Sequence, residues 1–253
     1  MKKIENIPYC KTANERQTLD LYLPENTDSF PVFVYFHGGG ITSGSKDEQK
    51  FVGDVVSKGI AVACANYRLY PYAVFPDFVR DAAAAVAWVH NNVSDYGNCT
   101  DLFVGGSSAG GYITQLLCFD KKYLDIHGID SDKISGYFMD AGQPTSHFNV
   151  LRERGLAPNR VIIDQTAPLY YAESGRSYAP MEIIVSDNDM PNRYEQTQLL
   201  VSTLKHCGAD MNRVFYKCVE NSGHCEYLDK QDENGRYIFA DMITEFINKI
   251  ISL

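Results

Sequence analysis

Residues 102–119 read LFVGGSSAGGYITQLLCF, a short apolar run, then a serine among small residues, then a helix-like segment from Tyr112 to Phe119. The pattern Gly-x-Ser-x-Gly between a strand and a helix is typical of a nucleophile elbow. Because that turn is sharp, the residues two before and two after the serine must lack bulk, as Gly106 and Gly110 do. The stretch therefore predicts that the hydroxyl of Ser108 is held out at the edge of a sheet, where a substrate can reach it.

Two other interpretations of this stretch are open. A shift by one residue would make Ser107 the nucleophile, with Ala109 as the second small residue. We prefer Ser108, because Gly110 then follows at the required spacing and Ala109 supplies the neighbouring amide. A phosphate-binding loop is less favoured, since no lysine follows at the phosphate-loop spacing.

A second glycine-rich element lies upstream. Residues 32–36, VFVYF, have the composition of a buried strand and lead directly into HGGG at 37–40. Acyl transfer places negative charge on the former carbonyl oxygen, and that charge needs hydrogen-bond donors fixed in advance. Glycine amides can approach an oxyanion closely, so we expect Gly39 and Gly40 to act as donors together with the amide of Ala109. We expect His37 to organise this loop instead of acting as a base.

Several motifs follow one another in a characteristic order over nearly the whole chain. They are HGGG at 37–40, NYRL at 66–69, FP at 75–76, DAAA at 81–84, WV at 88–89 and GSSAGG at 106–111. In this order the chain resembles α/β-hydrolases of the hormone-sensitive-lipase-like carboxylesterase group. The opening LDLYLP at 19–24 is also similar to that of compact bacterial acetyl and feruloyl esterases. One departure is Ile41, which stands where many relatives carry an aromatic residue.

The resemblance implies a catalytic base near the C-terminus, because the triad of this fold runs serine, then acid, then histidine. The chain has six histidines, at positions 37, 90, 127, 147, 206 and 224. His224 lies in a loop after the strand-like run Val214–Val219, which is where such a base belongs. We therefore expect His224 to be the base.

The acid is expected after the preceding strand, Met181–Val185, within the sequence SDNDMP at 186–191. Relatives commonly place a small residue after this strand and the acid three positions later, which favours Asp189. Asp187 stays open as the alternative, since either aspartate could instead form the turn. Asp140 is a third candidate, because it follows another predicted strand and some hydrolases take their acid from there.

The remaining pattern predicts one α/β domain over residues 1–253, with a mostly parallel eight-stranded sheet flanked by helices. The first two or three strands have no helix between them and should be antiparallel. Strands are expected near Ile4, Leu19, Val32, Ile60, Leu102, Ile134, Ile183 and Val214, and helices at 51–55, 77–92, 192–205 and 237–250. The sequence SKDE at 45–48 has capping-box spacing before the first of these helices.

Residues 141–179 are the least regular part of the chain. Relatives place lids or caps at this position, and a segment of this length predicts only a partial cover with an open cleft. Candidate residues of the substrate pocket are Ile41, Tyr112, Met190 and Tyr227.

The composition and net charge limit the kinds of molecule that we expect this protein to bind. The net charge of −9 disfavours a nucleic-acid partner or an anionic membrane surface. No apolar run is long enough for a signal peptide or a membrane span, and the seven cysteines follow no pairing pattern, so we expect a cytoplasmic protein. No HExxH or CxxC motif occurs, and we expect neither metal nor cofactor. A homodimer is compatible with the sequence, although nothing identifies the face.

These observations predict a serine hydrolase of short-chain carboxylic esters, with a small-molecule ester as substrate. By resemblance, acetyl esters on sugars or xylan fragments are favoured. The fold does not choose the substrate, so an amide, peptide or lactone hydrolase on the same scaffold, such as an arylformamidase, is the alternative. A non-catalytic binding protein that kept the fold is a more distant one.

Overall fold

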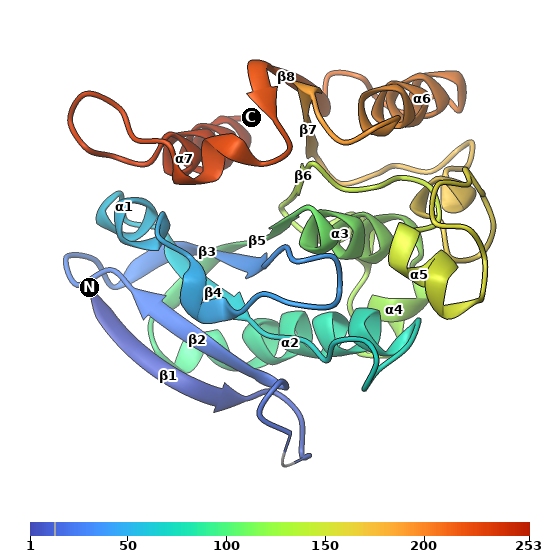
Figure 1. Cartoon of the computed structure of the whole chain (residues 1–253). Coiled ribbons are helices and arrows are strands. Elements are labelled where there is room, and N and C mark those ends of the chain that lie inside the picture. Colours follow the sequence, from blue (N-terminus) through green and yellow to red (C-terminus); the bar gives the residue numbers. More distant parts are fainter. Residues whose placement is uncertain (13) are drawn as a thin grey trace.

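An eight-stranded sheet runs through the middle of the molecule, in the order β1-β2-β4-β3-β5-β6-β7-β8 (Figure 1). The computed structural model describes residues 1–12 and 14–253. The strands are β1 (Lys2–Pro8), β2 (Thr18–Leu23), β3 (Ser29–Phe36), β4 (Ala61–Ala65), β5 (Asn98–Ser107), β6 (Gly136–Asp140), β7 (Met181–Asn188) and β8 (Val214–Gly223). From β4 to β8 all neighbours are parallel, whereas β2 is antiparallel to both β1 and β4.

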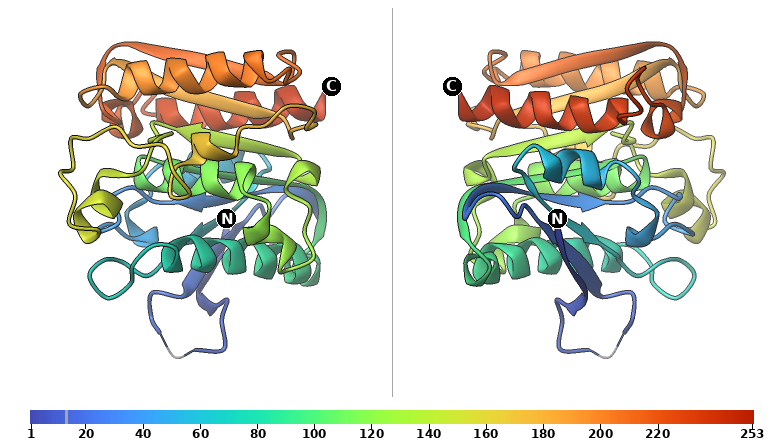
Figure 2. Two further views of the ribbon diagram at one scale, coloured as in Figure 1. Left: turned by 90° about the vertical axis from the view of Figure 1, so that its right-hand side faces the viewer. Right: turned by 90° about the vertical axis from the view of Figure 1, so that its left-hand side faces the viewer.

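Helices cover both faces of this sheet. On one face α2 (Asp77–Asn92), α3 (Ala109–Phe119) and α6 (Arg193–His206) pack in one apolar cluster, and on the other face α1 (Val52–Ser57) packs beside α7 (Ile238–Ile251). Figure 2 shows these two faces in turn. No helix in the described part of the chain is long and apolar enough to cross a membrane.

Strand β3 explains why the sheet has two apolar faces. Val32, Val34 and Phe36 belong to the core on the α3 side, while Phe33 and Tyr35 belong to the core on the α7 side. Successive side chains of a strand point to opposite faces, so a strand covered on both sides reads as a continuous apolar run. The run VFVYF is therefore a central strand, and it carries residues 37–40 to the carboxyl edge of the sheet.

The predicted fold class is confirmed, and all eight expected strands are present. β1 and β2 pair antiparallel as expected, but β3 pairs with β4 and β5 in parallel and does not touch β2 in the ladder. The crossover through α1 inserts β4 between them. The predicted cap at Ser45 is also displaced: Ser45 accepts a hydrogen bond from the amide of Asp47 and so caps a separate 3-10 turn, Lys46–Glu48, ahead of α1.

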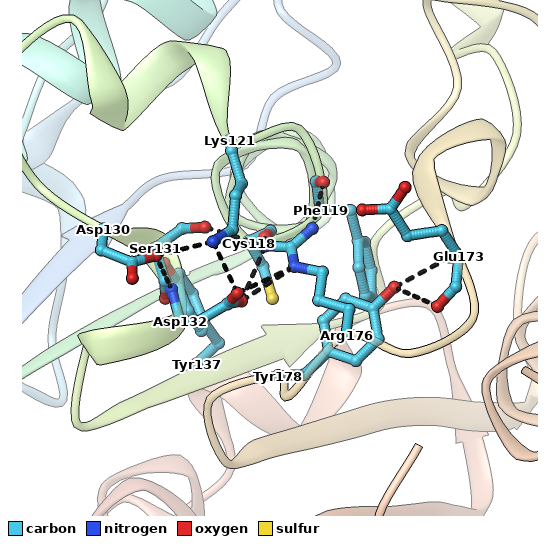
Figure 3. Close-up of polar contacts among 10 residues, drawn as sticks. All are labelled: Cys118, Phe119, Lys121, Asp130, Ser131, Asp132, Tyr137, Glu173, Arg176 and Tyr178. Carbon is cyan, nitrogen blue, oxygen red and sulfur yellow. Dashed lines mark hydrogen bonds and ion pairs between the residues drawn. The ribbon is translucent and has the colours of Figure 1, made fainter. Parts of the chain in front are cut away.

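Residues 141–179 contain only short helices, α5 (Phe148–Glu153) and a 3-10 helix at Pro168–Tyr171. Arg176 fastens the end of this segment to the core (Figure 3). Its guanidinium donates to the carbonyls of Cys118 and Phe119 at the end of α3 and pairs with Asp132 at 2.8 Å, while its flat face covers the ring of Tyr178. A nearly buried arginine with this many acceptors holds the segment in one position.

Candidate active site

The turn at Ser108 has the strained geometry of an elbow. Ser108 adopts φ 55° and ψ −112°, a backbone conformation that residues other than glycine rarely take, and α3 begins at the next residue. A Cβ on Gly106 would lie 2.7 Å from the carbonyl oxygen of Phe36, and one on Gly110 only 1.9 Å from the same atom. The glycines are therefore required by close backbone contacts between α3, β3 and β5, as the sequence pattern predicted.

The structure brings Ser108, His224 and Asp189 into one hydrogen-bonded chain. The hydroxyl oxygen of Ser108 lies 2.7 Å from Nε2 of His224, and Nδ1 of the same ring lies 2.6 Å from Oδ1 of Asp189. The Asp189 side chain is fully buried and also accepts the amide of Met190 at 2.7 Å. These three residues lie at the carboxyl end of β5 and just after β7 and β8, which run parallel and so meet at one sheet edge.

Electrostatics favour an ionised Asp189. Burial alone would raise the pKa of this carboxyl, but the hydrogen bond and charge of His224 outweigh burial, and its pKa is lowered below the ordinary value. An ionised acceptor at Nδ1 selects the histidine tautomer whose Nε2 accepts a proton. The arrangement can therefore draw the proton of Ser108 toward His224.

Asp187 serves another purpose in the fold. Its carboxylate is exposed and accepts the backbone amides of Asn221 at 2.8 Å and Ser222 at 3.1 Å, and these bonds lower its pKa. Asp187 thus braces the loop that carries His224 without touching the ring. Of the two aspartates left open by the sequence, Asp189 is the one in contact with His224.

Ser107 and Asp140 point away from this chain of hydrogen bonds. Ser107 is buried and accepts the hydroxyl of Tyr35 at 2.9 Å, on the opposite side of the strand from Ser108. Asp140 is completely buried at the end of β6 and accepts the hydroxyl of Tyr227. Burial raises the pKa of Asp140 to about 6. This second buried carboxyl beside the site was not expected to pair with Tyr227, because no motif links the two positions.

The glycine run lies directly against the elbow. A Cβ on Gly38 would be 3.3 Å from Cβ of Ser108, and Gly39 and Gly40 adopt φ of 105° and 62°. Within the described residues, the amides of Gly39 and Gly40 donate to no acceptor. The amide of Ala109 belongs to the first turn of α3, whose donors have no acceptor within the helix. The glycine loop and the start of α3, which meet where Gly38 lies against Ser108, thus hold three amides that have no acceptor in the described part of the chain.

His37 is buried under the glycine loop and bonds to it. The ring is buried, stacks on Tyr67 at 4.4 Å and donates from Nδ1 to the carbonyl of Gly38 at 2.6 Å. Arg16 lies 3.1 Å from Nε2 and also donates to the carbonyl of Gly44. Burial lowers the pKa of His37 to about 4, so the ring is neutral and Nε2 accepts from Arg16. Arg16 was missed by sequence reasoning, because it comes from the loop before β2 and carries no motif.

Three of the expected pocket residues are buried. Ile41, Tyr112 and Tyr227 are each at most 2% exposed and pack in the two apolar clusters, so their part in a substrate pocket stays a prediction. Tyr112 donates its hydroxyl to the carbonyl of Thr166, and Tyr227 donates to Asp140. Only Met190 keeps a place in a cavity wall, next to Asp189. Large amphipathic side chains near a site often pack inward, because burial of the ring is favourable when the hydroxyl finds an acceptor.

Cys225 lies beside this site, with its sulfur 3.8 Å from Nε2 of His224. Burial raises the pKa of this thiol well above its ordinary value, so it is not a nucleophile at neutral pH. In residues 1–12 and 14–253 there is no group of three or more His, Cys, Asp or Glu side chains arranged to hold a metal ion. The chemistry that these side chains can perform is nucleophilic attack by a serine with a histidine base.

The sheet order, the elbow and the two-sided helical cover define the α/β-hydrolase fold. The crystal structure of esterase B from Lactobacillus rhamnosis superposes with a TM-score of 0.78 over 99% of this chain and 86% of that one, at 18% identity. A likeness at this level of identity establishes the fold alone, and the chain has the α/β-hydrolase fold.

Sequence comparison identifies the relatives more closely. The BD-FAE family model matches residues 19–137, from β2 to β6. A probable isoprenylcysteine alpha-carbonyl methylesterase of Arabidopsis thaliana is 34% identical over 119 residues, 46% of this chain and 28% of that protein. A kynurenine formamidase of Danio rerio is 26% identical over 254 residues, 96% of this chain and 82% of that protein. The chain therefore spans little more than a quarter of the methylesterase but most of the formamidase, and carboxylesterases of this fold are among its relatives.

Proposed function

We propose that this protein is a carboxylic-ester hydrolase that uses Ser108 as nucleophile, His224 as base and Asp189 as acid. The observation that carries the proposal is the continuous chain from the Ser108 hydroxyl through His224 to the buried Asp189, with contacts of 2.7 and 2.6 Å. A serine on a strained elbow, hydrogen-bonded to a histidine that is itself oriented by a carboxylate, is the arrangement that activates a hydroxyl for acyl transfer.

The reaction follows in two halves. The oxygen of Ser108 attacks the acyl carbon while Nε2 of His224 takes its proton, and the tetrahedral intermediate collapses when His224 gives that proton to the leaving alcohol. Water then attacks the acyl-enzyme and loses a proton to His224. His224 returns that proton to the oxygen of Ser108 as the carboxylic acid product leaves. Asp189 keeps the histidine tautomer and stabilises the imidazolium in both halves.

The oxyanion is proposed to lie between the amides of Gly39, Gly40 and Ala109. Charge that develops in the transition state is stabilised most by donors that are already in position. The stacking of His37 on Tyr67 and its bond to the carbonyl of Gly38 support this role, because they fix the glycine loop before substrate arrives.

We propose that the acyl group is short, acetyl above all, and that residues 141–179 form only a partial cover. The short helices of this segment and the burial of Ile41 and Tyr112 favour a small acyl group over a long chain. Acetyl groups on sugars or xylan fragments stay the favoured natural substrates, on the sequence resemblance alone.

The test is the initial rate on p-nitrophenyl acetate, butyrate and octanoate. We expect wild type to prefer acetate, Ser108→Ala to be inactive and Ser107→Ala to retain activity, since Ser107 faces Tyr35. Ser107→Ala is the matched control for loss of a hydroxyl in the same turn. Undiminished hydrolysis by Ser108→Ala would overturn the proposal, and failure of a fluorophosphonate to label the folded protein would favour a non-catalytic role.

Amide hydrolysis is the second candidate, favoured by the Danio rerio kynurenine formamidase, which matches 96% of this chain. The same three residues could cleave an activated amide, because the attacking group and the oxyanion are unchanged. Rates on phenyl acetate and acetanilide, and on phenyl formate and formanilide, separate the two activities. Faster cleavage of either anilide would replace the ester assignment.

A further inference from the structure

A cavity of about 280 Å³ beside the proposed catalytic residues is lined by three arginines and no carboxylate. Its walls come from two distant parts of the chain, residues 143–160 and 190–196. The chain carries 32 acidic against 23 basic residues, so a cavity wall with three cations and no acid departs from the overall composition. The two largest of the hollows compared lie at the amino ends of β5 and β6, the opposite end of these strands from Ser108.

The cavity adjoins both sides of the candidate site. Phe148 lines it and would lie 3.5 Å from a Cβ on Gly40, so it touches the glycine loop. Met190 lines it as well and directly follows Asp189. The cavity therefore lies next to both the glycine loop and the segment that carries Asp189.

The three arginines have no carboxylate partners among the described residues. Arg193 is 3% exposed and donates only to neutral groups, the carbonyl of Ala141 and the side chain of Gln143. Arg152 is exposed and donates to the side chain of Asn149, and Arg160 is exposed with no ion pair. The ionised Asp189, which is bonded to His224, attracts Arg193 without forming an ion pair with it. None of the three guanidinium groups therefore has a direct carboxylate partner, and a ligand anion would supply one.

The nearby acids are engaged elsewhere or face away. Glu153 on α5 accepts the amide of Phe75, and Asp164 pairs with Arg154 at 2.8 Å. Glu195 on α6 is exposed and lies outside the cavity wall. Helix α6 also begins at Arg193, so the positive end of its dipole lies at this wall, where an arginine is unfavourable for the helix itself.

We infer that this cavity binds a carboxylate on the alcohol part of the substrate, attached to an apolar or ring-shaped body. Phe148, Pro158, Met190 and Pro191 provide the apolar wall for that body, and the arginines provide planar donors that suit a carboxylate. We place the charge on the alcohol part because the proposed acyl part, an acetyl group, carries no ionisable group. This inference rests on the proposed esterase function and adds the substrate class.

The test compares 4-acetoxybenzoate with its neutral methyl ester, methyl 4-acetoxybenzoate. We measure kcat/KM for both in wild type and in the double variant Arg152→Gln/Arg160→Gln, and use the ratio of the two substrates so that their intrinsic reactivities cancel. We expect the charged-to-neutral ratio to fall about tenfold in the variant, the size of one charge-assisted hydrogen bond at a partly exposed site. The ratio should also fall as NaCl is raised, because salt screens exposed charges.

The control is Arg80→Gln on α2, an exposed arginine paired with Asp77 at 3.5 Å and absent from the cavity wall. We expect Arg80→Gln to leave the ratio unchanged. A charge on the acyl side is tested with p-nitrophenyl hydrogen succinate against p-nitrophenyl butyrate. An unchanged ratio for the acetoxybenzoate pair would overturn the inference, and so would an arginine effect confined to the succinate pair, while neutral ester hydrolysis would leave the proposed function standing.

A binding measurement separates the inference from the proposed function. Benzoate should raise the melting temperature of wild type more than benzamide does, and this difference should disappear in Arg152→Gln/Arg160→Gln. If no ester is cleaved but benzoate still binds through the arginines, the anion site stands and the reaction class fails. Equal shifts from benzoate and benzamide in wild type would contradict the anion site.

Discussion

Replacement of Asp189 by asparagine is the sharpest test of the proposed catalytic residues, because the change keeps shape and removes one charge. Oδ1 of Asp189 lies 2.6 Å from Nδ1 of His224 and also accepts the amide of Met190. If the NH2 group of the asparagine takes the place of Oδ1, it donates to Nδ1, the tautomer with a proton on Nε2 becomes favoured, and that nitrogen can no longer accept the proton of Ser108. If the amide oxygen takes that place, it keeps the bonds to Met190 and to the ring, but the negative charge that stabilises the imidazolium is lost.

The expected fall in kcat follows from the weakened action of His224 as a base. The same exchange in a serine-protease triad lowers kcat by about 10⁴-fold, which corresponds to about 5.5 kcal/mol at 1.4 kcal/mol per factor of ten. We expect a similar fall for Asp189→Asn on p-nitrophenyl acetate, with KM changed far less, because the lost interaction acts in the transition state. The buried position of Asp189 means that solvent cannot replace the lost charge.

Asp187→Asn is the matched control, since it makes the same chemical change two residues away. Asp187 is exposed and braces the amides of Asn221 and Ser222, one of which an asparagine oxygen can still accept. We expect kcat for Asp187→Asn to stay within about tenfold of wild type, as for most surface substitutions. A larger loss in Asp187→Asn than in Asp189→Asn would refute the assignment, provided that both variants show the wild-type circular dichroism spectrum.

Two further outcomes concern stability. Burial raises the pKa of Asp140 to about 6 from 3.8, so the folded protein holds a proton that the unfolded chain releases, and this group destabilises the fold as pH rises from about 4 to 6. In urea unfolding, Asp140→Asn should therefore gain about 3 kcal/mol relative to wild type between pH 4 and pH 7, and a difference that does not change with pH would contradict this. Arg176→Met should lower the free energy of unfolding by about 3 kcal/mol, because it leaves the carbonyls of Cys118 and Phe119 without their donor and leaves Asp132 paired with Lys121 alone. Arg80→Met, at the exposed pair with Asp77, should cost under about 1 kcal/mol, and equal losses in the two variants would show that Arg176 does not fasten the covering segment.

Local patterns were enough for the elements that build the site. The elbow at Ser108 could be predicted because Gly106 and Gly110 are required by contacts within one strand-turn-helix unit. The glycine loop followed from its place after a continuous apolar run. The position of β4 between β2 and β3 could not be read locally, since strand order depends on how α1 crosses the sheet and not on the composition of any strand.

The choice between two aspartates needed the tertiary structure. Asp187 and Asp189 lie two residues apart in one short segment, and both are ordinary turn formers. The ladder between β7 and β8 shifts between Ser186 and Asn188, which leaves Asp187 against the next loop and Asp189 against His224. The spacing found in relatives favoured Asp189 but left Asp187 open, because a change in register of this kind depends on pairing between strands.

The sequence alone determined the fold class and which serine, glycines and histidine stand at the sheet edge, because each depends on contacts between residues close in the chain or on strand order along it. Only the tertiary structure decided that Ile41, Tyr112 and Tyr227 pack inward, and that Arg152, Arg160 and Arg193 line one cavity. Those arginines come from segments about 40 residues apart, and nothing in the sequence separates the buried Arg193 from exposed arginines such as Arg152 and Arg160. What matters is that the three arginines line one cavity whose wall has no carboxylate. This arrangement depends on how α5, the loop after it and the start of α6 pack together.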